Sequence, residues 1–227
     1  MTKVVVGRWS RGEGCWSTIA GRTLAAVLIV VGAVAGLAAL SAREKGGALP
    51  YYTDATFTPS WKESAQRVAP FTMLDQTGAS LTDRDLAGRP YVASFIYTRC
   101  SVLCPQLVSG LKSVQERLVH NELTIVSFTV TPELDPPAVL AGFGRERGID
   151  PKRWKLLTGS KADILALAAN SFFADDERLR ASLSGPEAFL HTEKLVLVDG
   201  VGRLRGVYNG SQRSDLDHLV EDARQWH

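Results

Sequence analysis

Two cysteines, Cys100 and Cys104, are the residues of this 227-residue chain whose spacing points most directly to chemistry. They stand in the stretch TRCSVLCP, between an apolar, β-prone run at 91–97 and a helical pattern that we expect to begin at Pro105. A helix N-terminus carries unpaired N–H groups and the positive end of the helix dipole, which lower thiol pKa values. Thiolates are redox nucleophiles and also ligands for soft metals, so this pair predicts either thiol–disulfide or metal chemistry.

A purely structural disulfide is the alternative for an exported domain. A ring closed between Cys100 and Cys104 would be so short that it stabilises the fold by only about 2 kcal/mol through the unfolded chain. This is a weak reason to place both cysteines at a junction between a strand and a helix, so a functional role is favoured.

The periodicity of apolar residues predicts the elements that must position these cysteines. Residues 91–97 and 123–130 are nearly continuous apolar runs, as strands buried on both faces require, and a helix between them makes a βαβ unit with parallel strands. Residues 194–198 and 203–208 flank a turn as an antiparallel hairpin. We therefore expect an α/β fold, a thioredoxin-like three-layer sandwich, since flavodoxin-like folds also begin βαβ but rarely end in a hairpin.

One of the four histidines has a distinctive position. His120, His218 and His227 lie in polar surroundings and are expected to be solvated surface residues. His191 instead stands between Phe-Leu and the apolar run LVLV, at the entry to the predicted hairpin. A lone histidine is more often an ordinary core or edge residue, but a thioredoxin-like sheet brings this part of the chain back beside the cysteine-bearing junction.

Two thiolates and one imidazole form a soft, three-coordinate set that suits Cu(I), and Cu(II) with one added ligand. Structural zinc usually has four ligands, and only Cys100, Cys104 and His191 are candidates, so copper ranks above zinc. Arg99 and Lys194 lie close to these candidates in sequence. They are either partners for the net negative charge of a Cu(I) dithiolate or ordinary solvated charges.

The N-terminal part predicts a single-pass membrane anchor. Residues 23–42 are uncharged and mostly apolar, and as a transmembrane helix they would span about 30 Å, the thickness of bilayer hydrocarbon. Residues 1–22 carry net +3, and positive residues stay in the cytoplasm, so we expect a cytoplasmic tail at the inner (cytoplasmic) membrane and a periplasmic, extracytoplasmic domain. Cleavage as a signal peptide is the alternative. Cys15 precedes the apolar run and is expected to be an incidental cytosolic thiol.

The rest of the chain divides into a tether and one working domain. Residues 43–67 lack a sustained period and are expected to be a tether, part of which docks on the domain through aromatic side chains. Residues 68–227 are then the thioredoxin-like, copper-binding domain. The chain's net charge of +2 comes from the N-terminal tail, so the remainder has no basic footprint and nucleic acid is excluded as a partner.

Several stretches taken together resemble the SCO/SenC family of membrane-anchored, thioredoxin-like copper proteins. They are YVASFIYTRCSVLCP, TPELDPP, LLTGSKADILALA and HTEKLVLVDGVGRL, and the similarity extends over about residues 68–210, including FTMLDQTGASLTDRDLAGRP. Each piece alone is a weak signal. The combination is fairly specific: CxxxC followed by proline, then a distant histidine before an apolar strand and an Asp/Gly turn.

The resemblance implies a metallochaperone that delivers copper to the binuclear CuA centre of a haem-copper (cytochrome c) oxidase during assembly. Its implied partners are the oxidase subunit that carries the CuA site and a small copper carrier as donor. By position, Cys100 and Cys104 are implied to be thiolate ligands and, if the protein is redox-active, the redox pair, with His191 as the third ligand.

The chain departs from the family pattern in two places. Ser101 stands where the family usually has proline, and Val102 replaces a common acidic residue. Thr131 takes the place of the first aspartate of the family's Asp-Pro-Glu-x-Asp motif, which leaves Asp135 as its only aspartate. We expect these changes to affect the tuning of the site or the choice of partner.

The rival function is an extracytoplasmic thiol–disulfide oxidoreductase acting on target cysteines. Such enzymes typically use CxxC with a cis-proline at the start of the returning strand. Here the spacing is CxxxC, and no proline lies nearer that strand than Pro186. A peroxiredoxin would want a threonine three residues before its cysteine, whereas Thr98 is two before Cys100. A pure interaction module with idle cysteines is the remaining alternative.

Overall fold

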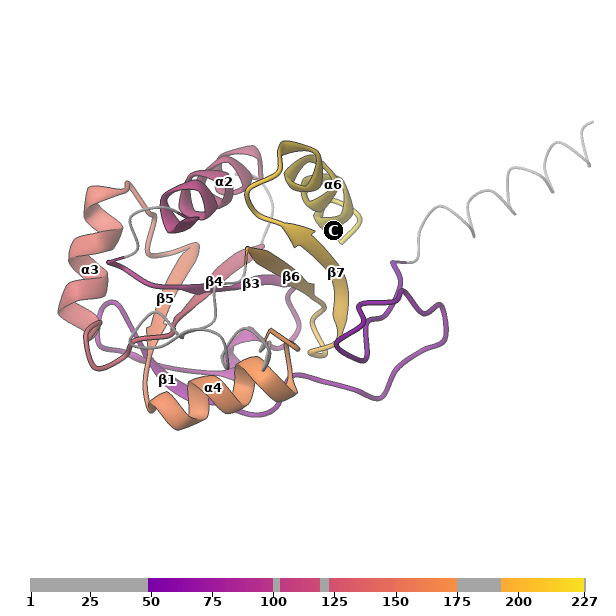
Figure 1. Cartoon of the computed structure of the whole chain (residues 1–227), viewed down its shortest axis with the longest axis horizontal. Helices are drawn as coiled ribbons and strands as arrows, with labels where there is room; N and C mark the ends of the chain where they lie inside the picture. Colours follow the sequence, from indigo (N-terminus) through magenta and orange to yellow (C-terminus); the bar gives the residue numbers. More distant parts are fainter. Residues whose placement is uncertain (1–48, 100–102, 119–122, 175–192, 227) are drawn as a thin grey trace, which may run out of the picture. The chain divides into compact units, whose positions relative to one another are not determined.

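The computed structural model describes residues 49–99, 103–118, 123–174 and 193–226, and the statements below concern these ranges. The segment Leu49–His227 forms one compact unit (Figure 1). The expected anchor at 23–42 and the candidate ligands Cys100 and His191 lie outside the described residues. Within the described ranges, no helix combines the length and the apolar character needed to cross a bilayer.

A mixed sheet forms the centre of the domain. Its strands are β1 (Thr72–Asp75), β2 (Ser80–Thr82), β3 (Tyr91–Ile96), β4 (Thr124–Thr129), β5 (Trp154–Thr158), β6 (Lys194–Val198) and β7 (Leu204–Asn209). Their spatial order is β2-β1-β5-β4-β3-β6-β7. The central strands β3, β4 and β5 are parallel, while β1 and β6 run antiparallel to their neighbours β5 and β3. The two apolar runs predicted from the sequence are therefore the parallel centre of the sheet, and the predicted hairpin is β6–β7.

Helices cover both faces of the sheet (Figure 1). One face packs against α2 (Leu103–Arg117), α3 (Pro137–Glu146) and α6 (Arg213–Ala223), and the other against α4 (Lys161–Asn170). A short 3-10 helix, η1 (Asp83–Leu86), follows β2. The buried residues form two apolar clusters, one on each side of the sheet. The expected α/β architecture with three layers is confirmed.

The face under α4 is rich in aromatic side chains. The rings of Phe95, Phe128 and Phe172 lie with their centroids 5.5–5.9 Å apart. Since Phe95 and Phe128 are partners on β3 and β4, this cluster fastens the parallel pair to the chain that follows α4. It lies near the carboxyl end of β3, so it supports the part of the sheet that leads into the cysteine motif.

A group of hydroxyls is buried between β3, β4 and β5. Ser94 Oγ and Ser127 Oγ lie 2.7 Å apart, and Trp154 Nε1 donates to Ser127 Oγ at 2.9 Å. All three residues are fully buried. Because a buried donor without a partner costs free energy, Ser127 satisfies two groups that water does not reach.

The helix after the cysteine motif begins earlier than expected. We expected Pro105 at the first helical position, but α2 begins at Leu103, which makes Cys104 its second residue and Pro105 its third. Proline is compatible with this position because the first four N–H groups of a helix have no intrahelical partner. Cys104 therefore belongs to the first turn of the helix and not to the loop before it.

Gly110 lets α2 approach the loop between β7 and α6 closely. A Cβ atom at Gly110 would overlap the carbonyl oxygen of Gly210 and lie 3.0 Å from Leu216 Cδ1. The N–H of Gly210 in turn donates to the carbonyl oxygen of Glu193, at 2.7 Å. The loop between β7 and α6 therefore contacts both α2 and Glu193, the residue before β6.

Residues 49–61, here called the clasp, lie against β7. Leu49 is buried, and the N–H of Tyr52 donates to the carbonyl oxygen of Leu204 at 3.1 Å. Tyr51 and Ser60 form an antiparallel bridge that closes the clasp on itself. The clasp belongs to the segment expected to be a tether, and the prediction that part of this segment docks on the domain is confirmed.

Arg205, on β7, binds the start of the clasp through its side chain. Its guanidinium donates to the carbonyl oxygens of Leu49 and Pro50 and to Asp199 Oδ2, the last at 3.2 Å. Burial raises the pKa of Asp199, but hydrogen bonds from the backbone and side chain of Arg203 outweigh it, and the pKa is lowered. Asp199 is therefore ionised at neutral pH, and it pairs with Arg203 and Arg205 at the β6–β7 turn, beside the clasp.

Candidate metal centre

The candidate site lies at the edge of the sheet where β3 ends and β6 begins. β3 ends at Ile96, and the chain continues through Arg99 directly to Cys100. Cys104 is the second residue of α2, which starts from the same end of β3. Because β6 is antiparallel to β3, its first residue, Lys194, also lies at this edge. The structure thus brings together the chain segments that adjoin the cysteine pair and the segment that follows His191, while Cys100 and His191 themselves lie outside the described residues.

The described residues offer no alternative metal site. Among them, no three His, Cys, Asp or Glu side chains gather closely enough to hold an ion. His218 lies on α6 and is exposed, as expected. His120 and His227 lie outside the described ranges. Cys104 remains the candidate ligand whose backbone the structure places.

The two basic residues near the expected ligands differ in their surroundings. Arg99 is exposed, as expected for a solvated charge. Lys194 is half-buried, and its Nζ lies 4.0 Å from the centroid of the Phe57 ring, which is a cation–π contact. Lys194 is therefore held by Phe57 of the clasp, and it carries a positive charge to the edge of the sheet where β6 begins.

A buried carboxylate lies between the ends of β3 and β4. Asp135 is completely buried, and its two oxygens accept hydrogen bonds from the hydroxyls of Thr98, Thr129 and Thr131. The sequence singled out Thr131 and Asp135 only as a departure from the family motif and missed the other two threonines. The signal that could have found them is the threonine at or just beyond the end of each central strand, where parallel strands deliver their last side chains to one place.

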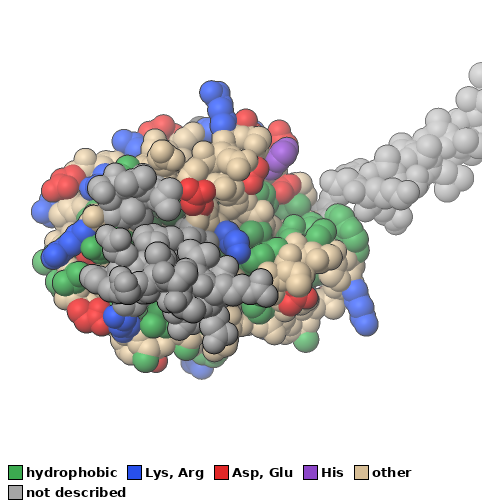
Figure 2. All heavy atoms as spheres, in the orientation of Figure 1, with side chains coloured by type: hydrophobic (Ala, Val, Ile, Leu, Met, Phe, Trp, Pro, Cys, Tyr) green, Lys and Arg blue, Asp and Glu red, His purple; other side chains and the backbone are tan. Residues whose placement is uncertain are grey.

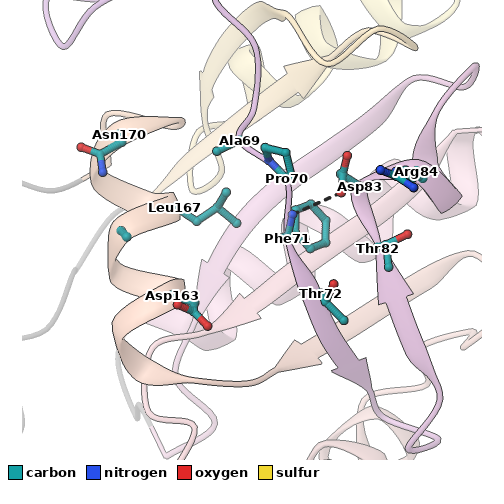
Figure 3. A pocket seen from close by; sticks show the side chains of 11 residues that line it. Ala69, Pro70, Phe71, Thr72, Thr82, Asp83, Arg84, Asp163, Leu167 and Asn170 are labelled. Carbon is teal, nitrogen blue, oxygen red and sulfur yellow. Dashed lines mark hydrogen bonds between the residues drawn. The ribbon is translucent and has the colours of Figure 1, made fainter.

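Two hollows in the described surface differ in their relation to this edge. A cavity of about 630 Å³ lies between β1, η1 and α4 (Figure 3), where Asp83 accepts a hydrogen bond from the N–H of Phe71, and no cysteine or histidine lines it. A hollow of about 850 Å³ lies between the first turn of α2 and the start of α6, with Pro105 and Arg213 in its wall. The second hollow adjoins the cysteine motif.

Charges on the surface are mixed in sign. On the part of the face in Figure 2 that is not grey, Lys and Arg side chains are interspersed with Asp and Glu. Ion pairs such as Arg117 with Asp217, whose atoms are 2.8 Å apart, contribute to this pattern.

The sheet has a parallel centre and helices on both faces, which is the architecture of a thioredoxin-like α/β domain. In the sequence, a CxxxC motif stands where β3 passes into α2. The model of the SCO1/SenC family matches residues 60–226. This chain belongs to the SCO1/SenC family.

Individual relatives agree with this assignment. The chain is 29% identical over 160 residues to the SCO1 protein homolog of Bacillus subtilis, covering 69% of this chain and 81% of that protein. Its structure is similar to that of BsSco, described as a member of the Sco family of cytochrome c oxidase assembly proteins with a disulfide switch (TM-score 0.61, 29% identity, 72% and 95% of the two chains). It shares its fold with Bradyrhizobium japonicum ScoI, solved with copper bound (TM-score 0.57, 23% identity, 72% and 100%). The thioredoxin-like fold expected from the sequence is that of these Sco proteins.

Proposed function

We propose that this protein binds one Cu(I) ion through the sulfurs of Cys100 and Cys104 and an imidazole nitrogen of His191, and delivers it to the CuA site of a cytochrome c oxidase. The observation that carries this proposal is the convergence of β3, α2 and β6 at one edge of the sheet. Cys100 follows the described chain by one residue and His191 precedes β6 by three, so each is tied closely to that edge.

The chemistry of the donor set supports copper as the cargo. Two thiolates and one imidazole are soft and borderline ligands, which select Cu(I) over hard cations such as magnesium or calcium. Cys104 is the second residue of α2, and the unpaired N–H groups of a helix N-terminus in general stabilise negative charge. A three-ligand set leaves the ion open to an incoming ligand, as transfer to another protein requires.

Copper titration of the full-length chain in detergent tests the proposal. Under anaerobic conditions with a competing Cu(I) chelator, we expect one Cu(I) per chain and an X-ray absorption spectrum with two sulfurs and one nitrogen around the metal. Cys100→Ser and Cys104→Ser should abolish tight binding, and His191→Ala should weaken it at least about tenfold, the loss expected from a missing ligand.

Two variants serve as matched controls. His218→Ala removes an exposed histidine of α6, and Cys15→Ser removes the third cysteine of the chain. Both should bind copper as the unchanged protein does. Equal affinity in His191→Ala and in the unchanged protein would contradict the proposed ligand set.

A second candidate function is reduction of a disulfide in the target, favoured by the relative described as having a disulfide switch. In this reaction the Cys100–Cys104 dithiol gives two electrons and two protons to the target disulfide and itself becomes a disulfide. His191→Ala should leave this activity intact, whereas either cysteine variant should abolish it. Loss of copper binding without loss of reductase activity in His191→Ala would separate the two functions.

We further propose that residues 23–42 anchor the protein in the cytoplasmic membrane, with the domain on the extracytoplasmic side. The net charge of +3 on residues 1–22 supports this orientation. The partner is then the oxidase subunit that carries the CuA site, which receives copper on the same side, with a small copper carrier as donor. Protease added to spheroplasts should digest the domain, whereas protection of the domain would contradict the orientation.

A further inference from the structure

The carboxylate of Asp135 joins two strands through threonine hydroxyls. Its Oδ1 accepts from the hydroxyl of Thr98, and its Oδ2 accepts from the hydroxyls of Thr129 at 2.5 Å and Thr131 at 3.0 Å. The backbone N–H of Thr98 also points to Oδ2, at 3.5 Å. One fully buried side chain thus connects the residues that leave β3 with the residues that leave β4.

The backbone around Asp135 fixes the carboxylate in place. The N–H groups of Leu134 and Asp135 both donate to the carbonyl oxygen of Thr131, which forms a tight turn after β4. β3 and β4 remain paired up to their ends, and the N–H of Val130 donates to the carbonyl oxygen of Ile96 at 3.0 Å. Beyond the sheet ladder, Tyr97 packs against the apolar cluster under α4, and Thr98 is then held by Asp135.

The contacts that the described residues make to the Asp135 side chain include three threonine hydroxyls and the backbone N–H of Thr98. A buried polar group is costly unless it is hydrogen-bonded, so this network compensates for the burial of Asp135. An apolar side chain could fill the same space without this requirement. Such an arrangement is expected where the geometry it enforces serves the function.

We propose that Asp135 is a positioning residue which, through Thr98, fixes the start of the loop that carries Cys100. Only Arg99 separates Thr98 from Cys100. Asp135 holds the chain before Cys100 and α2 holds the backbone of Cys104, so less ordering of the segment between them is needed on copper binding. The inference rests on the proposed function, because it concerns the same cysteine pair.

Thr98→Val tests the link with the smallest change, since valine keeps the shape of threonine and removes only the hydroxyl. We expect Thr98→Val in the full-length chain to bind Cu(I) about tenfold more weakly, a factor that corresponds to about 1.4 kcal/mol. Thr98→Ser restores the hydroxyl and should return the affinity to within twofold of the unchanged protein. Asp135→Asn should weaken binding in the same direction.

Thr77→Val is the matched control. The Thr77 hydroxyl also donates to a buried carboxyl group, that of Asp75, at 2.5 Å. This pair lies in the β1–β2 turn beside the amino end of β5, which is the opposite end of the sheet from Thr98. Its loss should leave copper affinity unchanged. A general loss of stability would instead affect both valine variants alike.

A second readout uses the protein without metal. The Cys100–Cys104 disulfide and two glutathione molecules equilibrate with the dithiol and one glutathione disulfide, and looser positioning should shift this equilibrium toward the dithiol by about tenfold in Thr98→Val. If the unchanged protein binds no Cu(I), the proposed function fails and this equilibrium alone decides the role of Asp135.

Two outcomes would overturn the inference. The first is a Thr98→Val protein whose copper affinity and disulfide equilibrium both stay within twofold of the unchanged protein. The second is tighter copper binding in Asp135→Asn with no change in Thr98→Val, which would show that the carboxylate acts by its charge and not by holding the loop.

Discussion

Replacement of Gly110 by alanine should destabilise the domain, although alanine is the residue that helices favour most. A Cβ at this position overlaps the carbonyl oxygen of Gly210 and lies 3.0 Å from Leu216 Cδ1. The nearest obstacle is backbone, so relief requires the loop after β7 to move away from α2. Overpacking of this kind costs about 1–3 kcal/mol, and the helix gains about 1 kcal/mol from losing a glycine. Because the nearest obstacle is backbone, the cost falls in the upper part of that range, and we expect a net loss of about 1–2 kcal/mol.

Gly142 of α3 provides a control with the opposite sign. It is also inside a helix, but the nearest atom to an added Cβ is Arg145 Nη2 at 4.0 Å, which is ordinary contact with a flexible side chain. Only the helix gain then remains, and Gly142→Ala should stabilise the domain by about 0.5–1 kcal/mol.

Thermal unfolding followed by circular dichroism distinguishes the two variants. For a domain of this size, 1 kcal/mol shifts Tm by about 2–4 °C, so Gly110→Ala should unfold below the unchanged protein and Gly142→Ala above it. If Gly110→Ala raised Tm as much as Gly142→Ala, the close approach between α2 and the β7–α6 loop would not constrain the helix, and the steric reasoning would be refuted.

Three further perturbations follow from buried polar groups. Ser127→Ala leaves the Trp154 indole N–H without its acceptor and should cost about 1–3 kcal/mol in chemical denaturation; a cost below 0.5 kcal/mol would mean that the indole finds another partner. The pKa of Asp199 is lowered by Arg203 against the effect of burial, so its stabilising contribution is complete above about pH 4, the unfolded value, and is lost as pH falls through the folded pKa. The stability difference between the unchanged protein and Asp199→Asn should therefore shrink with acidification below pH 4 in urea titrations, and a constant difference would contradict this. Arg205→Met removes the donors that hold the clasp and should speed cleavage within residues 49–61 under limited proteolysis, whereas an unchanged cleavage pattern would show that the clasp is held without them.

The sheet could be predicted from the sequence because its signals are local. The runs at 91–97 and 123–130 are apolar on both faces, and only strands covered by helices on both sides have that pattern. The start of α2 was predicted two residues late, since proline fits anywhere in a first turn and its position alone does not fix the boundary. The cysteine and histidine spacing predicted the site, and it stays a prediction for Cys100, Cys104 and His191.

The contacts that tie the site and the clasp together could not be predicted, because they depend on strand register. The threonines near the ends of β3 and β4 are visible in the sequence, but Thr98 and Asp135 are far apart there, and only the pairing of the two strands brings their side chains together. Arg205 reaches Leu49 across most of the chain, so this contact exists only once β7 has its place at the edge of the sheet.

The clasp has a consequence for self-association. β7 is an outer strand of the sheet, and an outer strand with free N–H and C=O groups is a template for pairing with a second chain. The clasp occupies the carbonyl oxygen of Leu204 at the start of this strand, and the opposite outer strand, β2, is only three residues long before the chain turns into η1. The clasp and the shortness of β2 thus limit the backbone groups that the two outer strands offer to a second chain, which reduces the risk of edge-to-edge aggregation.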